Sequence, residues 1–310
     1  MPHNQTILFV VFNIFILFML ALDLGVFHKK AHTVTLKESA IWSVVWVILA
    51  IAFNAGVFIF AGHVTGLEFL TGYLIERALS FDNIFVFVVI FSYFGVPSQY
   101  QHKALFWGIL GALVTRSIFI AAGTALIVHF EWVLYIFGVI LIASGWKMMF
   151  QKGIEVHPEK NIFIRLAKKL FPVTTGFESS KFMIRKEGKL FLTPLLLVLI
   201  TIETTDIVFA VDSIPAVFGV TRDPFIVYSS NVFAILGLRA TYFLLAGIMD
   251  TFYYLSHGLS LVLIFIGAKM LVADFFHVSI TVSLIVVAVI LIVSVVASLV
   301  RNRRAGASKA

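Results

Sequence analysis

Acidic side chains lie inside two segments of this chain that are otherwise apolar enough to cross a lipid bilayer. The two segments are 74–96 and 199–220, and together they carry five carboxylates: Glu76, Asp82, Glu203, Asp206 and Asp212. Acidic groups are costly to bury in hydrocarbon, so they mark ion pathways, proton relays or binding sites. The two acidic segments therefore carry the main functional signal of the sequence.

The two acidic segments also resemble each other. A shift of 124 positions places Asp82 on Asp206 (206 against 82). The same shift places the Phe-Gly-Val tripeptide at 94–96 on the one at 218–220. We therefore expect both segments to contribute to one site.

The polar groups of these segments all offer hard oxygen atoms. The amide of Asn83 and the hydroxyl groups of Ser80, Thr204, Thr205 and Ser213 accompany the carboxylates. Oxygen ligands suit Mn²⁺, Ca²⁺ or Mg²⁺, whereas copper, iron and zinc more often recruit Cys, Met or His. The chain has no cysteine, and its nine histidines lie at segment ends or in loops. The predicted metal ligands are Glu76, Asp82, Asn83, Glu203, Asp206 and Asp212.

A purely structural role for these acids is the alternative. Arg77, Arg116 and Arg239 also lie in apolar segments and could neutralise three of the five carboxylates. Acid would still remain in excess. An unpaired carboxylate in a low dielectric favours its protonated form unless a cation compensates it. The excess acids could therefore hold either protons or a divalent metal.

The acids of the second segment require a particular helix geometry. Glu203 and Asp206 are neighbours at i and i+3, but Asp212 lies about 240° further round a regular helix than Asp206. One straight face cannot carry all three. Pro215 lacks an amide hydrogen and would clash with the carbonyl of Val211. We therefore predict a break in this helix that turns Asp212 toward the other acids.

The composition indicates an all-α polytopic membrane protein. Of the 310 residues, 61% are hydrophobic and 13% are charged, whereas soluble domains carry about 25% charged residues. We expect about nine transmembrane helices, each near the length needed to cross a bilayer. Their approximate limits are 7–27, 41–62, 68–94, 104–125, 131–149, 190–218, 225–247, 252–272 and 277–299.

The basic residues predict the orientation of the chain. We assign 17 of the 23 lysines and arginines to cytoplasmic segments, as the positive-inside rule requires. Lys29 and Lys30 follow the first helix, which places the N-terminus outside and the C-terminus in the cytoplasm. The segment 150–189 is then cytoplasmic, and 162–170 has the pattern of an amphipathic helix at the membrane surface. No motif for binding nucleic acid accompanies the positive charge.

Two three-helix repeats are predicted on either side of this cytoplasmic segment. One ends in Gly-Trp-Lys-Met at 145–148 and the other in Gly-Ala-Lys-Met at 267–270. The repeats enter the membrane from opposite sides, as the inverted repeats of many secondary transporters do. The expected divisions are 1–66 for two N-terminal helices, 67–150 for the first repeat, 151–189 for a basic linker, 190–273 for the second repeat, and 274–310 for a last helix with a basic tail.

Three motifs resemble the signatures of the TerC family. They lie at 73–87 (YLIERALSFDNIFVF), 203–217 (ETTDIVFAVDSIPAV) and 230–243 (SNVFAILGLRATYF). The family is named for tellurium resistance, and the resemblance implies a bacterial inner-membrane protein that exports Mn²⁺ through the acids of the two repeated helices. Some members are described as redox modulators instead, but this sequence contains neither cysteine nor a nicotinamide-binding motif that would support that role.

The expected function is thus that of a secondary transporter, without enzymatic activity or a prosthetic group. Its partners would be the lipid bilayer, protons and Mn²⁺ as the transported ion. Two alternatives stay open: a Ca²⁺ transporter of the same mechanism, and a non-transporting membrane scaffold in the response to metal or tellurite stress. A scaffold would recruit proteins through the 150–189 segment.

Overall fold

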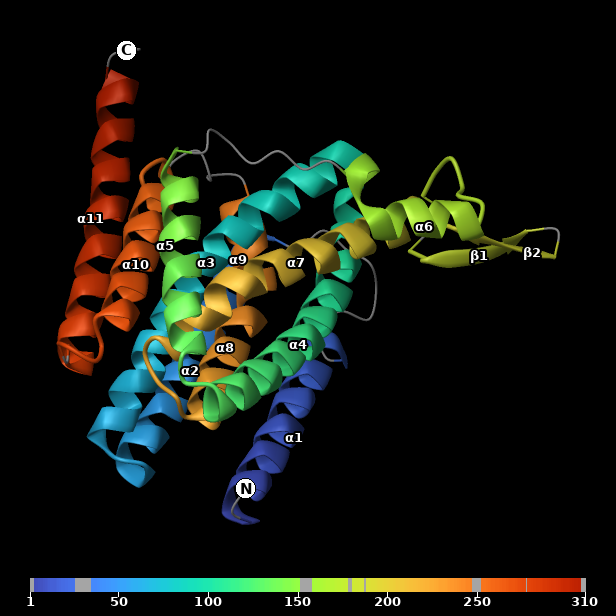
Figure 1. Cartoon of the computed structure of the whole chain (residues 1–310). Helices are drawn as coiled ribbons and strands as arrows, with labels where there is room; N and C mark the ends of the chain where they lie inside the picture. The colour runs from blue at the N-terminus through green and yellow to red at the C-terminus, as the bar shows by residue number, and fades with distance from the viewer. Residues whose placement is uncertain are drawn as a thin grey trace.

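The computed structural model describes residues 3–25, 35–150, 158–177, 180–186, 188–246, 252–276 and 278–307, most of them in helices (Figure 1). The helices up to residue 150 are α1 (His3–Gly25), α2 (Leu36–Phe60), α3 (His63–Phe94), α4 (Ser98–His129) and α5 (Val133–Phe150). A connecting region follows, with η1 (Pro158–Lys160), α6 (Ile162–Leu170), β1 (Met183–Lys186) and β2 (Lys189–Leu192). The remaining helices are α7 (Pro194–Phe218), α8 (Pro224–Leu236), α9 (Leu238–Leu245), α10 (Leu255–Leu271) and α11 (Ile280–Ala307).

Each of the nine predicted apolar segments overlaps a helix, and the seventh corresponds to α8 and α9 together. Within the described ranges, five helices are long and apolar enough to cross a membrane by length and composition: α2, α4, α5, α7 and the 280–302 part of α11. The predicted all-α membrane fold is therefore confirmed. A total of nine spans stays a prediction.

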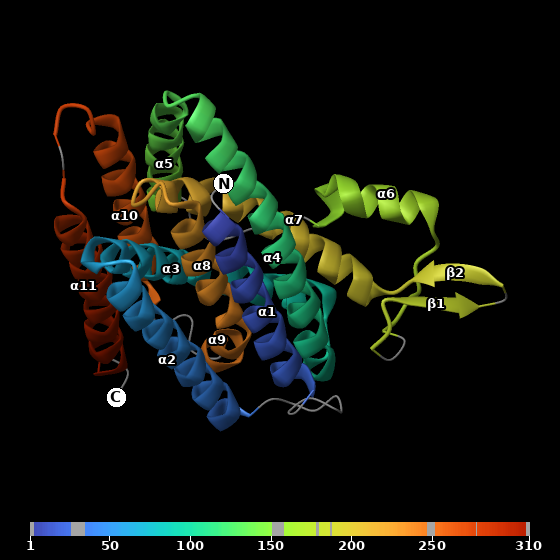
Figure 2. The same ribbon diagram turned by 90° about the horizontal axis from the view of Figure 1, so that it is seen from below.

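The helices that carry polar side chains occupy the middle of the bundle. In α8, nearly every residue from Ile226 onward is buried, and α8 packs against both α3 and α4. At one edge of the bundle lies α11, opposite the α6–hairpin region (Figures 1 and 2). Many large apolar side chains of α11 are exposed, as expected of a helix that faces lipid. The polar groups are thus shielded by apolar helices around them.

Close approaches at glycines show how the central helices run. Gly108 and Gly123 of α4 meet Ile202 and Phe218 of α7 in the same order, so α4 and α7 run parallel. Gly138 of α5 meets the backbone of Gly267 in α10, where a Cβ at Gly267 would lie 2.6 Å from the Gly138 carbonyl oxygen. Such small residues let membrane helices approach to backbone contact.

The predicted break at Pro215 is wrong. The helix α7 continues through Pro215 and ends at Phe218, three residues later. Because Pro215 lies in the last turn, its missing amide hydrogen affects only the carbonyl of Val211, and the helix continues to Phe218.

A break occurs instead at Gly237, between α8 and α9. The guanidinium of Arg77, on α3, occupies the space beside this glycine and donates to the carbonyl of Ala234 over 3.1 Å. A Cβ at Gly237 would lie 2.4 Å from Arg77 Nη1. The absence of a side chain at Gly237 thus makes room for the guanidinium of Arg77.

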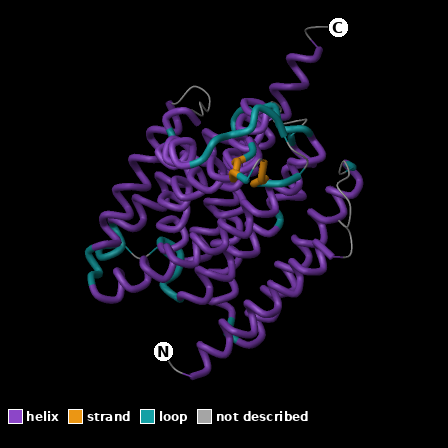
Figure 3. The backbone as a smooth tube through the Cα atoms, turned by 90° about the vertical axis from the view of Figure 1, so that its right-hand side faces the viewer, coloured by secondary structure: helices purple, strands orange, loops and turns teal. Residues whose placement is uncertain are grey.

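The connecting region forms an arm beside the bundle (Figures 1 and 2). The predicted amphipathic helix is confirmed as α6, with Asn161 as its N-cap and with exposed apolar side chains such as Ile162 and Leu170. The hairpin β1–β2, which pairs Met183 with Leu192, was not predicted. Figure 3 shows it as the one small sheet among the described helices. Consequently the sixth apolar segment becomes helical at Pro194 rather than at 190.

Candidate ion site

A small cavity lies where the two acidic helices meet. Its volume is about 20 Å³, and four of the predicted ligands line it: Glu76, Asp82 and Asn83 from α3, and Asp212 from α7. Ser213 of α7 and Arg116 of α4 complete its polar surface. Roughly 10–15 Å³ suffices for one water molecule, so the space accommodates a single particle of that size. The structure thus brings acids of both segments to one buried space.

Arg116 dominates the charge balance beside this cavity. Its side chain is 2% exposed and its Nη2 and Nε donate to the two carboxylate oxygens of Asp206 over 3.0 and 3.3 Å. Its Nη1 forms an ion pair with Glu76 Oε1. One guanidinium therefore connects α3 to α7 through two buried acids, as the structural alternative anticipated for part of the set.

Two further acceptors complete the surroundings of Arg116. The hydroxyl of Ser213 lies 3.2 Å from Nη1, and the amide oxygen of Asn231, on α8, lies 3.3 Å from it. Two atoms of this cluster are buried without a hydrogen-bond partner in the described chain: Glu76 Oε2 and Asn231 Nδ2. The cluster is therefore incompletely satisfied, which is uncommon for buried polar atoms.

Asp82 differs from Asp206 despite their matching positions. It is 7% exposed and lines the cavity, yet it forms no hydrogen bond or ion pair with any residue that the structure describes. Asn83 lines the same cavity and is also buried. Asp82 is thus the acid of this site that a mobile cation or a proton would have to compensate.

The remaining acids of α7 face different neighbours. Asp212 accepts a hydrogen bond of 2.6 Å from Ser144 of α5. The carboxylate of Glu203 lies over Gly111 of α4 and does not line the cavity. The three acids of α7 therefore have different surroundings: Asp206 pairs with Arg116, Asp212 accepts from Ser144, and Glu203 lies against Gly111 and close enough to Asp206 for their charges to repel.

Sequence reasoning missed two residues of the cluster and underrated a third. Ser144 and Asn231 were not among the candidates, and Arg116 was considered only as one of three possible counter-charges. A buried amide in an apolar segment is a usable signal for Asn231, because such groups need partners. No comparable signal marks Ser144, which is one of many serines in apolar helices.

Within the described residues, no three histidine, cysteine or acidic side chains are close enough together to hold a metal ion. In the conformation observed, Arg116 holds Glu76 and Asp206, and Ser144 binds Asp212. Part of the oxygen atoms that could bind a metal are thus already bound to protein groups.

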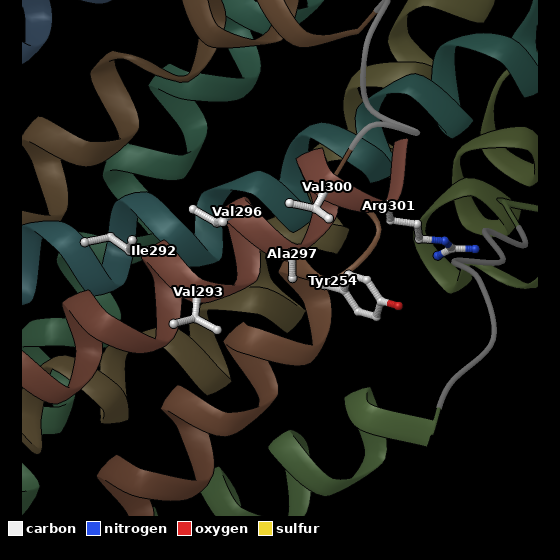
Figure 4. Close-up of a pocket in the computed structure, with 7 residues that line it drawn as sticks. All are labelled: Tyr254, Ile292, Val293, Val296, Ala297, Val300 and Arg301. Atoms are coloured by element: carbon white, nitrogen blue, oxygen red, sulfur yellow. The ribbon is translucent and has the colours of Figure 1, made fainter. Parts of the chain in front are cut away.

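A larger hollow lies on the outside of α11 (Figure 4). It is an open groove of about 590 Å³ lined mainly by apolar residues, with Tyr254 and Arg301 as its polar members. The guanidinium of Arg301 lies 3.4 Å from the centre of the Tyr253 ring. No carboxylate lines this groove, so it is not suited to binding a cation.

Fold and site together define a class: an all-α integral membrane protein with acidic groups buried among its central helices. Residues 61–306 match the family described as "Integral membrane protein TerC family". The chain belongs to the TerC family.

Relatives match nearly the whole chain. An "Uncharacterized membrane protein STKORF319" of Myxococcus xanthus is 52% identical over 299 residues, which cover 96% of this chain and 94% of the relative. The "Putative membrane-bound redox modulator Alx" of Salmonella typhi is 47% identical over 92% of this chain and 91% of its own. The protein of that name from Escherichia coli K12 is 47% identical over 91% of each chain. No solved structure matches.

Proposed function

We propose that this protein is a secondary transporter that exports a divalent metal cation from the cytoplasm, with Mn²⁺ as the first candidate, in exchange for protons. The observation that carries this proposal is the shared cavity. Carboxylates from both acidic helices line it, and Asp82 has no counter-charge among the described residues. A buried acid of this kind needs a proton or a metal to neutralise it.

The charge balance of the site supports an exchange of cations. Four carboxylates lie in or beside the cavity, those of Glu76, Asp82, Asp206 and Asp212. Arg116 is the one basic residue among those that line it, and Lys147 lies close enough to Asp212 to attract it, so acid stays in excess. Burying several negative charges without compensation is very unfavourable. Protons that arrive from outside would replace the metal on the same oxygen atoms.

The chemistry of the ligands restricts the ion but does not select one. Carboxylate, amide and hydroxyl oxygens suit Mn²⁺, Ca²⁺ and Mg²⁺ alike. The resemblance to manganese-exporting members of the family favours Mn²⁺, and a Ca²⁺ transporter of the same mechanism is the nearest variant. The proposed setting is the bacterial inner membrane, with the N-terminus outside and the C-terminus in the cytoplasm.

Helix packing supports the inverted repeat that such a mechanism uses. Residues that match between the repeats differ here by 122 positions (267 against 145, and 260 against 138). Gly138 contacts Gly267, and Gly145 contacts Ser260. The 122-position shift carries Gly138 onto Ser260 and Gly145 onto Gly267, so each contact is the counterpart of the other. An antiparallel helix pair with this property has an approximate two-fold axis across it. In a membrane that axis lies in the bilayer plane, as in inverted-repeat transporters.

Flux through reconstituted protein tests the proposal. Liposomes that contain the wild-type protein and a dye that responds to Mn²⁺ should show metal movement driven by a pH gradient. Asp82→Asn should abolish this movement because the amide cannot exchange a proton for a metal. The matched control is Glu131→Gln, which neutralises an exposed acid far from the cavity. Competition by Ca²⁺ and Mg²⁺ for the Mn²⁺ flux then ranks the three ions by their affinity for the transporter.

A non-transporting scaffold is the second candidate function. The pairing of Glu76 and Asp206 with Arg116 favours it, because those acids already serve as helix-to-helix links. A scaffold predicts no flux in wild-type liposomes and unchanged metal tolerance in cells that carry Asp82→Asn. Relatives named as redox modulators suggest a third activity, but this chain has no cysteine for a thiol couple.

A further inference from the structure

The guanidinium of Arg116 is surrounded by oxygen atoms in the manner of a bound metal ion. Five oxygens accept hydrogen bonds or ion pairs from it, contributed by α3, α7 and α8: Glu76 Oε1, Asp206 Oδ1, Asp206 Oδ2, Ser213 Oγ and Asn231 Oδ1. Ca²⁺ takes about six to eight such oxygens. Glu76 Oε2, which is buried and has no partner in the described chain, would add a sixth.

A second cation in the cavity would conflict with Arg116 at its present position. Arg116 itself lines the cavity, so a divalent ion there would lie beside a side chain that already carries a positive charge. Like charges in contact repel strongly where the dielectric is low. Moreover, Glu76 contributes to both environments, since its Oε1 pairs with Arg116 and the residue also lines the cavity.

We propose that Arg116 is a tethered substitute for the transported ion. In this inference, which rests on the proposed function, the guanidinium and the divalent metal use the same oxygen atoms alternately. The metal binds as Arg116 releases Glu76 and Asp206, and Arg116 returns to them when the metal leaves. Asn231 and Ser213 then become metal ligands of the loaded state.

Such a substitute would act after the metal has been released, when the empty transporter returns to the conformation that is open to the cytoplasm. Glu76 and Asp206 are 1% and 4% exposed and would be uncompensated without a cation. Arg116 supplies that cation without leaving the protein. Its removal should therefore strengthen metal binding, because a competitor is lost, and should slow export, because the metal-free return becomes unfavourable. A merely structural arginine would change binding and export in the same direction.

The experiment measures Mn²⁺ affinity and Mn²⁺ export for wild type, Arg116→Lys and Arg116→Gln. Free Mn²⁺ is quantified by electron paramagnetic resonance for protein in detergent, and export is followed in liposomes. Lysine keeps the positive charge but lacks the planar fork that binds two carboxylates, so this variant covers the case in which Arg116→Gln does not fold. Thermal unfolding of each variant verifies folding.

We expect Arg116→Lys to bind Mn²⁺ more tightly than wild type and Arg116→Gln to bind about 10-fold more tightly, with export slowed about 10-fold in Arg116→Gln. Affinity in Arg116→Lys that equals or falls below the wild-type value overturns the inference while export by the wild type stands. If the wild type neither binds nor moves Mn²⁺, the proposed function fails, and this inference fails with it.

Asn231, which is uncharged, allows two explanations of a gain in affinity to be distinguished. Either the metal takes over the oxygen atoms that Arg116 held, or the loss of Arg116 only removes a repulsive charge nearby. Adding Asn231→Ala to Arg116→Lys should cancel the gain in affinity, because Asn231 becomes a ligand only when the guanidinium is gone. The control is Ser229→Ala in the same background, since Ser229 is buried on the same helix and its hydroxyl donates to the carbonyl of Ile226 in that helix. An equal effect of both changes, or no effect of Asn231→Ala, contradicts displacement.

Discussion

At the scale of single residues, Asp82 and Asp206 occupy matching positions in the two acidic segments but differ in whether a counter-charge lies beside them. Asp206 accepts hydrogen bonds from Nη2 and Nε of Arg116, whereas Asp82 faces the cavity without a counter-charge in the described structure. Their free energies of burial differ accordingly. A charged pair with well-formed hydrogen bonds recovers much of its desolvation cost, but a lone carboxylate does not.

This difference predicts opposite effects of two similar substitutions on stability. Asp206→Asn should lower the free energy of unfolding by about 3 kcal/mol, since it removes one partner of a buried ion pair. Asp82→Asn should leave stability unchanged or slightly higher, because it removes an acid that nothing neutralises. Thermal unfolding in detergent measures both. Equal losses in the two variants would contradict the assigned pairing.

A second prediction concerns Glu203, which the sequence places in the ligand set and the structure places outside the cavity. Glu203→Gln should reduce Mn²⁺ flux by less than Asp82→Asn does, since its carboxylate lies over Gly111 and does not line the cavity. Initial flux rates in liposomes with equal amounts of protein provide the measurement. Complete loss of flux in Glu203→Gln would show that this acid belongs to the ion path.

The acids of the site could be predicted from sequence, but their partners could not. Carboxylates in apolar segments stand out because burial is so unfavourable for them. Which arginine pairs with which acid depends on helix packing at the scale of a few ångströms. Arg77 and Arg116 look alike in the sequence, yet Arg77 binds the carbonyl of Ala234 and Arg116 binds two acids.

At the scale of helices, α5 and α10 cross with their backbones in contact. Backbone meets backbone at Gly138 and Gly267, and a second contact joins Gly145 to the carbonyl of Ser260. Membrane helices gain stability from such approaches through van der Waals contact. Any side chain added there must push the helices apart.

Gly267→Ala should therefore destabilise the protein by about 1–3 kcal/mol, as overpacking of a tight contact does. Its Cβ would lie 2.6 Å from a backbone oxygen that cannot move independently. Gly56→Ala is the control, because no atom lies within 4 Å of the Cβ position on α2. That change should gain up to about 1 kcal/mol from helix propensity. A change in thermal stability of the same sign in Gly267→Ala and Gly56→Ala would refute this account of the crossing.

Sequence patterns located the helices well and their interruptions poorly. Hydropathy found every apolar segment, and the amphipathic pattern gave α6 its observed bounds. Pro215 suggested a break that does not occur. A proline in the last turn has few helical residues after it, so little of the helix remains for it to interrupt. The actual break at Gly237 depends on the insertion of Arg77, a contact between residues 160 positions apart (237 against 77) that no local pattern reveals.

At the scale of the whole molecule, the composition of the chain makes its orientation in the membrane directly testable. The chain contains no cysteine, so every cysteine introduced reports on its own position. Cysteine in place of Glu131, at the exposed start of α5, should react with an impermeant thiol reagent added outside intact cells. Cysteine in place of Lys168, on α6, should react only after the membrane is opened. The reverse pattern would invert the predicted topology.

The arm built from α6 and the β1–β2 hairpin has a practical consequence for the two halves of the chain. It contacts the bundle through polar groups, among them a hydrogen bond of 2.6 Å from Asn161 to Thr204. A polypeptide cut at the hairpin turn would leave one strand on each fragment. The four residue pairs of that ladder and the α5–α10 crossing would then guide the separately synthesised fragments to reassemble as a complemented pair.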